Sequence, residues 1–392
     1  MAYLSEDQYD FIEKNYHLSP SDFILNSKKY PFWDIKFIAQ QLVGRNLAKK
    51  KLPTWFKTKN IQYPERISIE QCSSEKTAIF KANILSVGTG VDLTGGFGVD
   101  TFYISQKVKS IVYCEQNKPL SSIALHNFSQ FYQKNIEVYH GDGITYLRNC
   151  STIDWIYIDP SRRNDNNKVY YLSDCKPNIL DYFPLLLSKA PILLIKTSPL
   201  LDIKKTLSDL LSVKRVYVIS VNNDCKEVLY LVEKNFEGET HISCNNLKSD
   251  NEEIFEFTFS EEQEYLLIYS EPLKYLYEPN ASIMKAGAFK TIAKHFGLYK
   301  IHANSHLYTS DKQINQFPGR SFIVQNILSP DSKSIPIILR GKANITCRNY
   351  PQNIDILRKK LKLKDGGDFY IFATTLQSGK ARLILCKKLI SL

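Results

Sequence analysis

The hydrophobic pattern at the start of the chain predicts a helical segment. In "IKFIAQQLVGRNLA" the apolar residues recur mostly at helical spacing: Ile35, Ile38, Ala39, Leu42 and Leu47. Further along, Ser73 and Ser74 precede "EKTAIFKANIL", and serine is a favoured residue at helix N-termini. We therefore expect residues 1–77 to form an N-terminal helical segment, acting as a lid or a dimer element.

Between residues 78 and 236 short apolar runs alternate with amphipathic stretches. The predicted strands are "GVDLT", "SIVYCE", "IEVYHGD", "IDWIYIDP" and "PILLIKTSP", followed by "KRVYVISVN" and "EVLYLVEKN". Alternation of this kind is typical of an α/β fold with a doubly wound, Rossmann-like parallel sheet. We place this domain at residues 78–240.

The last two predicted strands are joined by the short polar turn "NDCK". A parallel connection needs a dozen or more residues, so this pair must be antiparallel. Dinucleotide dehydrogenases usually keep their sheet parallel to its end. A parallel sheet closed by an antiparallel strand is instead typical of S-adenosylmethionine-dependent methyltransferases.

The remainder of the chain predicts a small α+β region. The polar stretch "EGETHISCNNLKSDNEE" indicates a loop, and in "EPNASIMKAGAFKTIAKHFGLYKI" we expect one helix, capped by Asn280 and ended by Gly297. Strands then surround a helix in "NIDILRKKLKL", before and after the turn "KDGGD".

The charge distribution indicates a nucleic-acid partner. The 392 residues carry a formal charge of +11, and residues 340–392 contain twelve Lys and Arg against three Asp, a surplus of nine. Solvated surface is the alternative explanation for these basic residues.

Other classes receive less support from the sequence. The acidic start "MAYLSEDQYD" and the lack of an apolar run near 20 residues predict a soluble cytoplasmic protein without a membrane partner. Eight cysteines without a CxxC pair predict reduced thiols. His302 and His306 have no ligand-type residues in register, so we predict no metal site.

Residues that follow the predicted strands suggest one cofactor site, because ligands of open α/β sheets bind beyond the carboxyl ends of the strands. The glycine turn "DLTGGFG" suits a carboxylate group at the start of a helix, Glu115 suits ribose hydroxyls and Asp142 suits an adenine amine. Together these groups describe S-adenosylmethionine. The predicted cofactor-binding residues are Asp92, Thr94, Gly95, Gly96, Gly98, Glu115, Asp142 and Gly143.

Each of these residues also has a purely structural interpretation. Asp92 and Asp142 could cap loops, and Glu115 alone would be a surface acid. The turn reads GGxG, which matches poorly the G-x-G-x-x-G pattern of dinucleotide sites. An oxidoreductase is therefore the weakest of the functional hypotheses.

The fourth strand ends in "DPSRR", which predicts the site of methyl transfer. Enzymes that methylate amines carry a short Asp/Asn-Pro motif here, whose oxygens orient the nitrogen lone pair. The predicted catalytic residues are Asp159, Pro160, Arg162 and Arg163. The arginines could hold phosphate or stack on a base, or Asp159 could cap a turn while the arginines pair with acids. Lys196, Thr197 and Ser198 follow the fifth strand and either line the substrate side or simply end the strand.

The sequence resembles bacterial class I S-adenosylmethionine-dependent methyltransferases that carry a C-terminal THUMP-like domain. The similarity runs through "EQCSSEKTA", "DLTGGFGVD", "IDPSRR", "KTSPLLD", "NDCKEVLYL", "EPNASIMKAGAF", "FPGR", "KANITCRNYP" and "LKLKDGGDFYIFATT". The family usually reads "DPARR", so Ser161 is a small-for-small departure. The resemblance implies a ferredoxin-like segment at 262–320 and a THUMP-like RNA-binding domain at 321–392.

These observations lead to a main hypothesis and two alternatives. We expect an S-adenosylmethionine-dependent enzyme that methylates a base nitrogen in structured RNA, either tRNA or rRNA. Its predicted substrate-binding residues are Lys196, Arg348, Arg358, Lys359 and Lys360. A methyltransferase acting on protein or a small molecule, and a non-catalytic RNA-binding protein, are the alternatives.

Overall fold

The chain divides into two compact units. The computed structural model describes residues 4–162 and 171–389. The first unit comprises Met1–Lys214 with Leu229–Glu237, and the second comprises Arg215–Val228 with Gly238–Leu392. The chain therefore passes between the units three times, and two of these crossings lie within strands. Within the described residues, the helices are too short or too polar to traverse a lipid bilayer.

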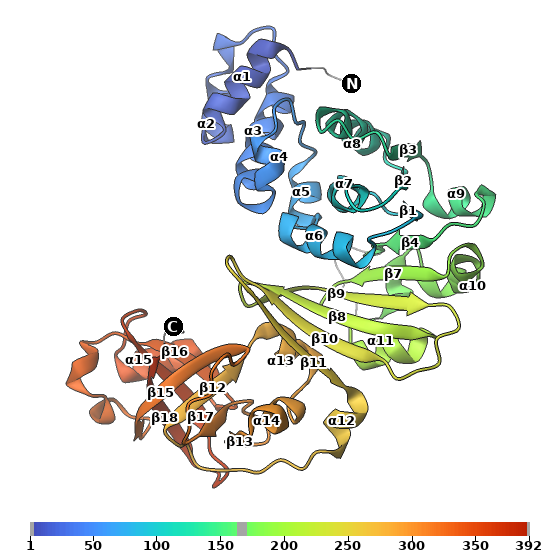
Figure 1. The fold of residues 1–392 in the computed structure, drawn as a ribbon. Coiled ribbons are helices and arrows are strands. Elements are labelled where there is room, and N and C mark those ends of the chain that lie inside the picture. The colour runs from blue at the N-terminus through green and yellow to red at the C-terminus, as the bar shows by residue number, and fades with distance from the viewer. Residues whose placement is uncertain (1–3, 163–170, 390–392) are drawn as a thin grey trace. The chain divides into compact units, whose positions relative to one another are not determined.

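The first unit begins with six helices, as the hydrophobic pattern predicts (Figure 1). They are α1 (Glu6–Asn15), α2 (Pro20–Leu25), α3 (Ile35–Lys51), α4 (Pro53–Lys57), α5 (Arg66–Gln71) and α6 (Glu75–Ile84). Ile38 and Leu42 of α3 pack in a buried cluster with Ile12 of α1 and Phe23 of α2. Ser74 caps α6 by accepting the backbone N–H of Thr77. The junction between α5 and α6 comprises residues 72–74.

A parallel sheet follows in the first unit. Its strands are β1 (Thr89–Asp92), β2 (Ser110–Glu115), β3 (Ile136–His140), β4 (Trp155–Ile158) and β7 (Ile192–Thr197), in the order β7-β4-β1-β2-β3. The connecting helices are α7 (Val99–Ser105), α8 (Lys118–Gln130), α9 (Gly143–Asn149) and α10 (Ile179–Lys189). The chain reverses its direction of winding between β1 and β4, and ligands bind at such a switch point in open α/β sheets.

The predicted antiparallel pair of strands is present, but the sheet continues beyond it. Strands β8 (Val213–Val221) and β9 (Asp224–Glu233) are joined by Asn222 and Asn223, whose φ angles of 51° and 65° are those of a type I′ hairpin turn. The strand order continues β8-β9-β7, and the C-terminal half of β9 belongs to the first unit with β7. The unit also contains the short strands β5 (Ser161–Arg162) and β6 (Cys175–Lys176) and helix α11 (Ile203–Asp209).

The loop predicted after residue 236 is wrong in large part. β10 (His241–Leu247) pairs parallel with β8, and β11 (Glu252–Thr258) pairs antiparallel with β10. Asn245 and Asn246 are buried, and the Ser220 hydroxyl donates to the Asn246 side chain over 2.9 Å. Polar side chains that are satisfied within β10 or by neighbouring strands gave this stretch the composition of a loop.

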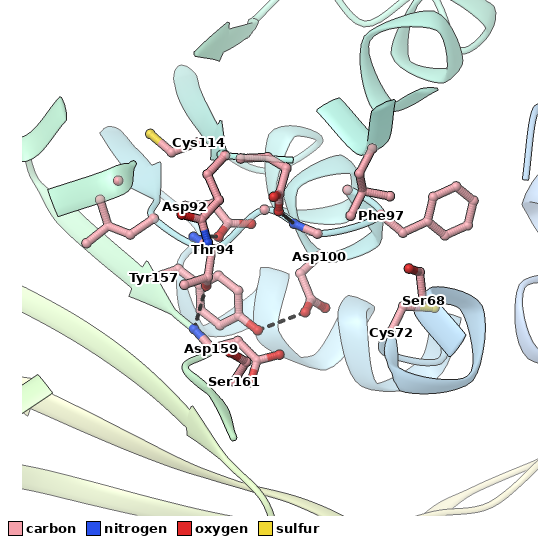
Figure 2. A pocket seen from close by; sticks show the side chains of 18 of the residues that line it. Ser68, Cys72, Asp92, Thr94, Phe97, Asp100, Cys114, Tyr157, Asp159 and Ser161 are labelled. Atoms are coloured by element: carbon pink, nitrogen blue, oxygen red, sulfur yellow. Dashed lines mark hydrogen bonds between the residues drawn. The ribbon is translucent and has the colours of Figure 1, made fainter. Parts of the chain in front are cut away.

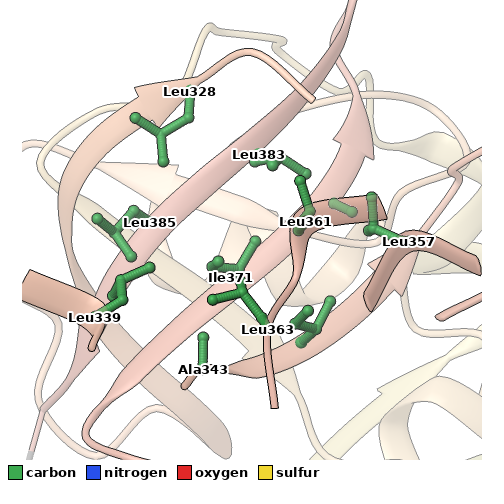
Figure 3. Close-up of a cluster of buried hydrophobic side chains, with 11 residues drawn as sticks. Leu328, Leu339, Ala343, Leu357, Leu361, Leu363, Ile371, Leu383 and Leu385 are labelled. Carbon is green, nitrogen blue, oxygen red and sulfur yellow. The ribbon is translucent and has the colours of Figure 1, made fainter. Parts of the chain in front are cut away.

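The second unit contains a second sheet with α15 (Ile354–Leu361) packed on it. The strands follow the order β13-β14-β12-β15-β18-β17-β16. Figure 3 shows Leu357 and Leu361 of α15 among buried residues of the sheet that include Ile371 and Leu383. The strand bounds are β12 (Tyr275–Pro279), β13 (Tyr299–Lys300), β14 (Tyr308–Ser310), β15 (Gly319–Leu328), β16 (Asn344–Arg348), β17 (Phe369–Thr375) and β18 (Ala381–Lys388).

The single helix predicted between Asn280 and Gly297 is two helices. α13 (Ala281–Ala286) ends at Gly287, which is left-handed with φ 79°, and α14 (Thr291–Phe296) ends at Gly297 with φ 60°. Asn280 does cap α13 by accepting the backbone N–H of Ile283. The predicted limits were correct, but a C-terminal glycine in the middle of the stretch was missed. Helix α12 (Phe259–Glu264) precedes this region.

Candidate functional site

A cavity of about 480 Å³ lies at the carboxyl edge of the parallel sheet in the first unit. It brings together all eight predicted cofactor-binding residues and Asp159, although these lie up to 67 positions apart in sequence. The predicted residues that line it are Asp92, Thr94, Gly95, Gly96, Gly98, Glu115, Asp142, Gly143 and Asp159. Figure 2 shows Asp92, Thr94 and Asp159 among the labelled lining side chains.

The glycine turn is held close to strand β2. The Gly95 N–H donates to the Cys114 carbonyl over 2.8 Å, and a Cβ at Gly95 would lie 2.2 Å from the Tyr113 ring. Gly96 is left-handed with φ 56°, and a Cβ there would meet no protein atom closer than 3.8 Å. Gly95 therefore allows the turn to pack, whereas Gly96 leaves open space beside the backbone.

Asp92 stabilises this turn through hydrogen bonds to its buried side chain. Its side chain is 1% exposed, and it accepts the Thr94 N–H over 3.0 Å and the Thr101 hydroxyl over 2.6 Å. Burial raises the pKa of Asp92 to about 7, although these hydrogen bonds act in the opposite direction. Asp92 therefore caps the turn, as the structural interpretation expected, and it also lines the cavity.

Glu115 and Asp142 offer carboxylate oxygens to the cavity. Glu115 accepts the Gly96 N–H over 3.0 Å and the Asn117 N–H over 2.7 Å, one on each oxygen. Asp142 is exposed and caps α9, with one oxygen accepting both the N–H and the hydroxyl of Thr145. Since a carboxylate oxygen can accept more than one hydrogen bond, both side chains retain acceptor capacity for a ligand.

Asp159 stands where β4 leaves the sheet. Its backbone N–H donates to the Thr94 hydroxyl over 2.7 Å, which ties it to the glycine turn. Its carboxylate forms an ion pair with Lys196, whose side chain is only 12% exposed and does not belong to the cavity lining. Lys196 thus contacts Asp159 rather than the space in which a substrate would lie.

The other residues of the "DPSRR" motif are placed differently. Pro160 is buried and is not among the lining residues, whereas Ser161 is exposed and lines the cavity. The backbone of Arg162 forms β5, in which Ser161 pairs with Lys176. Arg163 lies outside the described residues.

Asp100 is a lining residue that the sequence reasoning missed. One of its oxygens lies 3.2 Å from the Lys81 ammonium group, and the other accepts the hydroxyls of Ser73 and Tyr157, each over 2.8 Å. Burial raises the pKa of Asp100, but the charges of Lys81 and Lys196 outweigh it, so the net shift is downward. Its position just after the glycine turn was the available signal, but its partners come from elsewhere in the sequence.

The predicted substrate-binding residues of the second unit are partly engaged in ion pairs. Arg348 pairs with Glu278 at 2.9 Å, and Arg358 pairs with Asp365 at 2.7 Å. Lys359 and Lys360 are exposed in the last turn of α15. Two of the four predicted phosphate contacts in this unit therefore already have an acidic partner.

Glu278 is the centre of a second buried ion cluster. It is 3% exposed and lies opposite Arg320 in the pairing of β12 with β15. The Arg320 guanidinium pairs with one of its oxygens and the Arg348 guanidinium with the other. This cluster joins three of the sequence motifs, "EPNAS", "FPGR" and "CRNYP", in one place.

Comparison with known proteins places the two C-terminal segments in families. Residues 275–318 match the model of a ferredoxin-like domain, and residues 319–388 match that of a THUMP domain-like family. No protein of curated function matches the sequence.

Among solved structures, a "putative methyltransferase" from Porphyromonas gingivalis W83 matches nearly the whole chain. It is 32% identical, the match covers 99% of this chain and 100% of that one, and the TM-score is 0.88. A putative RNA methyltransferase from Pyrococcus horikoshii covers 47% of this chain and 98% of its own, at 13% identity and a TM-score of 0.34. At that score the second structure adds nothing to the assignment. The full-length match and the two domain matches together show that the chain belongs to the family of class I S-adenosylmethionine-dependent methyltransferases with a C-terminal THUMP-like domain.

Proposed function

We propose that this methyltransferase uses S-adenosylmethionine to methylate a nitrogen atom of a base in structured RNA. The observation that carries the proposal is the cavity itself, which joins the carboxylates of three successive strand ends with Asp159. A cofactor that presents a carboxylate, a ribose and an adenine fits this donor and acceptor set.

The residues present fit the cofactor in chemistry and in space. Glu115 has acceptor capacity for ribose hydroxyls, Asp142 has capacity for an amine, and the open side of Gly96 gives room beside the backbone. When bound, S-adenosylmethionine supplies an electrophilic methyl group on a positively charged sulfur. The chain must then hold the acceptor nitrogen in line with that methyl group.

Asp159 is the residue that we assign to this positioning. Its carboxylate can accept an N–H of the acceptor, which directs the nitrogen lone pair, and the ion pair with Lys196 holds the carboxylate in place. With the cofactor bound, the acceptor nitrogen would take the methyl group and the C–S bonding pair would stay on sulfur, so the role of Asp159 is to hold that nitrogen in place. The proton that the nitrogen loses goes to Asp159 or to water. Water can reach this point because the Asp159 side chain is 33% exposed.

The RNA substrate is inferred from charge and from the domain match. Residues 340–392 carry a surplus of nine positive charges, which gives salt-dependent affinity for phosphates. Lys359 and Lys360 are the exposed members of the predicted set. We therefore propose that residues 321–392 bind RNA, residues 78–240 perform the transfer, and residues 262–320 form the ferredoxin-like segment.

Calorimetry with the full chain tests the cofactor. S-adenosylmethionine should bind, and Glu115→Ala should weaken binding about tenfold, or about 1.4 kcal/mol, because a charged double acceptor is lost. Asp154→Ala is a matched control, since Asp154 accepts the Thr89 N–H elsewhere in the unit and does not line the cavity. Equal affinity of wild type and Glu115→Ala would move the cofactor out of this cavity.

Nucleoside mass spectrometry tests the substrate. Total RNA from cells with and without the protein should differ in one methylated nucleoside, and purified protein should restore it. A methyltransferase acting on protein or a small molecule would bind the cofactor yet leave all RNA nucleosides unchanged.

A further inference from the structure

The N-terminal helical segment supplies part of the wall of the cavity. Four consecutive or nearly consecutive residues at the junction of α5 and α6 line it: Ser68, Gln71, Cys72 and Ser73. None of them belongs to the glycine turn or to the carboxylates that suit the cofactor. This part of the wall therefore faces space that the proposed cofactor contacts do not account for.

The wall is anchored to the sheet by buried polar contacts. The Lys81 ammonium of α6, which is fully buried, donates to the Ser73 hydroxyl over 3.0 Å and pairs with Asp100. Asp100 in turn accepts the hydroxyls of Ser73 and of Tyr157 in β4, the strand that leads to Asp159. Figure 2 shows the Asp100 carboxylate between Tyr157 and the Cys72 side chain. The junction and the end of β4 are thus fixed relative to each other within the first unit.

The side chains of this wall differ in what they can recognise. Burial raises the pKa of the Cys72 thiol to about 11, so it remains a neutral group, and its sulfur donates to the Ile69 carbonyl. The Ser73 hydroxyl is already engaged by Lys81 and Asp100. Gln71 is exposed and, within the described residues, its amide makes no hydrogen bond to the protein. Its donor and acceptor are therefore available at the cavity.

We propose that Gln71 determines specificity by binding the hydrogen-bonding edge of the base that is methylated. A primary amide presents one donor and one acceptor side by side, and this pair complements a base with an adjacent acceptor and amino group, as in adenine. The proposal rests on the proposed function, because it takes the acceptor to be a nucleobase. It gives the N-terminal segment a role in substrate selection.

The carboxylates near this wall have cationic partners, so the space suits an uncharged base. Asp100 is neutralised by Lys81, and Asp159 is neutralised by Lys196. Lys176 lines the same cavity, is exposed and has no ion-pair partner among the described residues, so it is available to a phosphate of the same nucleotide. A base with its phosphate therefore meets complementary groups in the cavity that Asp159 lines.

The test measures binding of adenosine 5′-monophosphate to the full chain by calorimetry, with S-adenosylhomocysteine present at saturation. The product cofactor fills the cofactor part of the cavity, so the nucleotide reports on the remainder. We expect Gln71→Ala to weaken nucleotide binding about tenfold and to leave S-adenosylhomocysteine affinity unchanged. Gln71→Glu, which keeps the acceptor but loses the donor, should also weaken it. Gln106→Ala is the matched control, because Gln106 is an exposed glutamine of the same unit that does not line the cavity.

Kinetics on the RNA substrate give a second readout. Gln71→Ala should raise KM for the RNA about tenfold with kcat changed less than threefold, whereas loss of folded protein would lower the apparent kcat and leave KM unchanged. If Gln71→Ala behaves as Gln106→Ala does in nucleotide affinity and in KM, while wild type methylates RNA, the inference is overturned and the proposed function stands. If wild type binds the nucleotide through Gln71 but no RNA nucleoside changes in cells, the site is supported and the RNA substrate is refuted.

Discussion

Two largely buried carboxylates, Asp100 in the first unit and Glu278 in the second, are each joined to basic side chains from distant parts of the sequence. Asp100 pairs with Lys81, whose side chain is 0% exposed, and also accepts two hydroxyls. Glu278 pairs with Arg320 and Arg348, whose side chains are 30% and 41% exposed. Only Asp100 lines the cavity of the first unit.

The comparison shows that a buried ion pair does not by itself mark a functional site. A pair persists wherever its members satisfy one another, because breaking it leaves a buried charge without a partner. The cavity is what distinguishes Asp100, since there the fixed charges border space for a ligand. The Glu278 cluster instead joins three strands of a sheet at places where the arginines also reach water.

Asp100→Ala should give the largest effect on stability. It leaves the Lys81 ammonium fully buried without its counter-charge, which costs about 3–5 kcal/mol of unfolding free energy. Denaturant unfolding followed by circular dichroism would measure this loss. The double variant Lys81→Met with Asp100→Leu should recover most of it, and a double variant as unstable as the single one would mean that the hydroxyl contacts dominate.

Glu278→Ala should cost less, about 2 kcal/mol, because the two guanidinium groups that lose their partner are partly solvated. Cofactor affinity should not change, since Glu278 lies in the second unit. Denaturation and calorimetry on the same sample would separate the two effects. A larger loss than for Asp100→Ala would reverse the comparison.

Asp92 sharpens the comparison as a buried carboxylate that accepts hydrogen bonds from a hydroxyl and an N–H. Its pKa of about 7 in the folded state lies above the ordinary value near 4, so between these pH values the folded chain binds the extra proton. Stability from this group therefore falls as pH rises from 4 to 7 and is constant above.

Asp92→Asn removes this titration. The free energy of unfolding of the variant relative to wild type should rise by about 1.4 kcal/mol per pH unit between pH 5 and 6. Urea denaturation at the two pH values measures it, with Asp154→Asn, a surface carboxylate, as the control. A difference that stays flat across this range would mean that Asp92 is already ionised at pH 5.

The sequence was most informative where strands are buried on both faces. Runs such as "IDWIYIDP" and "PILLIKTSP" contain β4 and β7, and the rule that ligands bind beyond strand ends was enough to gather Asp92, Glu115, Asp142 and Asp159 into one cavity. The THUMP-like region was predicted from the resemblance alone, and the family match confirms it at residues 319–388.

The sequence was least informative where tertiary contacts satisfy polar groups. Buried Asn245 and Asn246 made a strand look like a loop, because composition does not show their partners, which are Ser243 of the same strand for Asn245 and Ser220 of β8 for Asn246. The anchor of Lys81, Asp100 and Tyr157 joins three positions with no shared periodicity. Arg348 and Arg358 looked available for phosphate because sequence does not reveal ion pairs across a fold.

The hairpin of β8 and β9 has a practical consequence for dissecting this protein. Residues 229–237 return to the first unit after the chain has entered the second. A shortened protein ending at Lys214 would therefore lose β9, the strand that lies next to β7 in the sheet. It would expose the backbone of β7 as a bare, aggregation-prone edge. Truncation for separate expression should therefore keep the chain through Glu237, and the transferase part will then carry the hairpin tip with it.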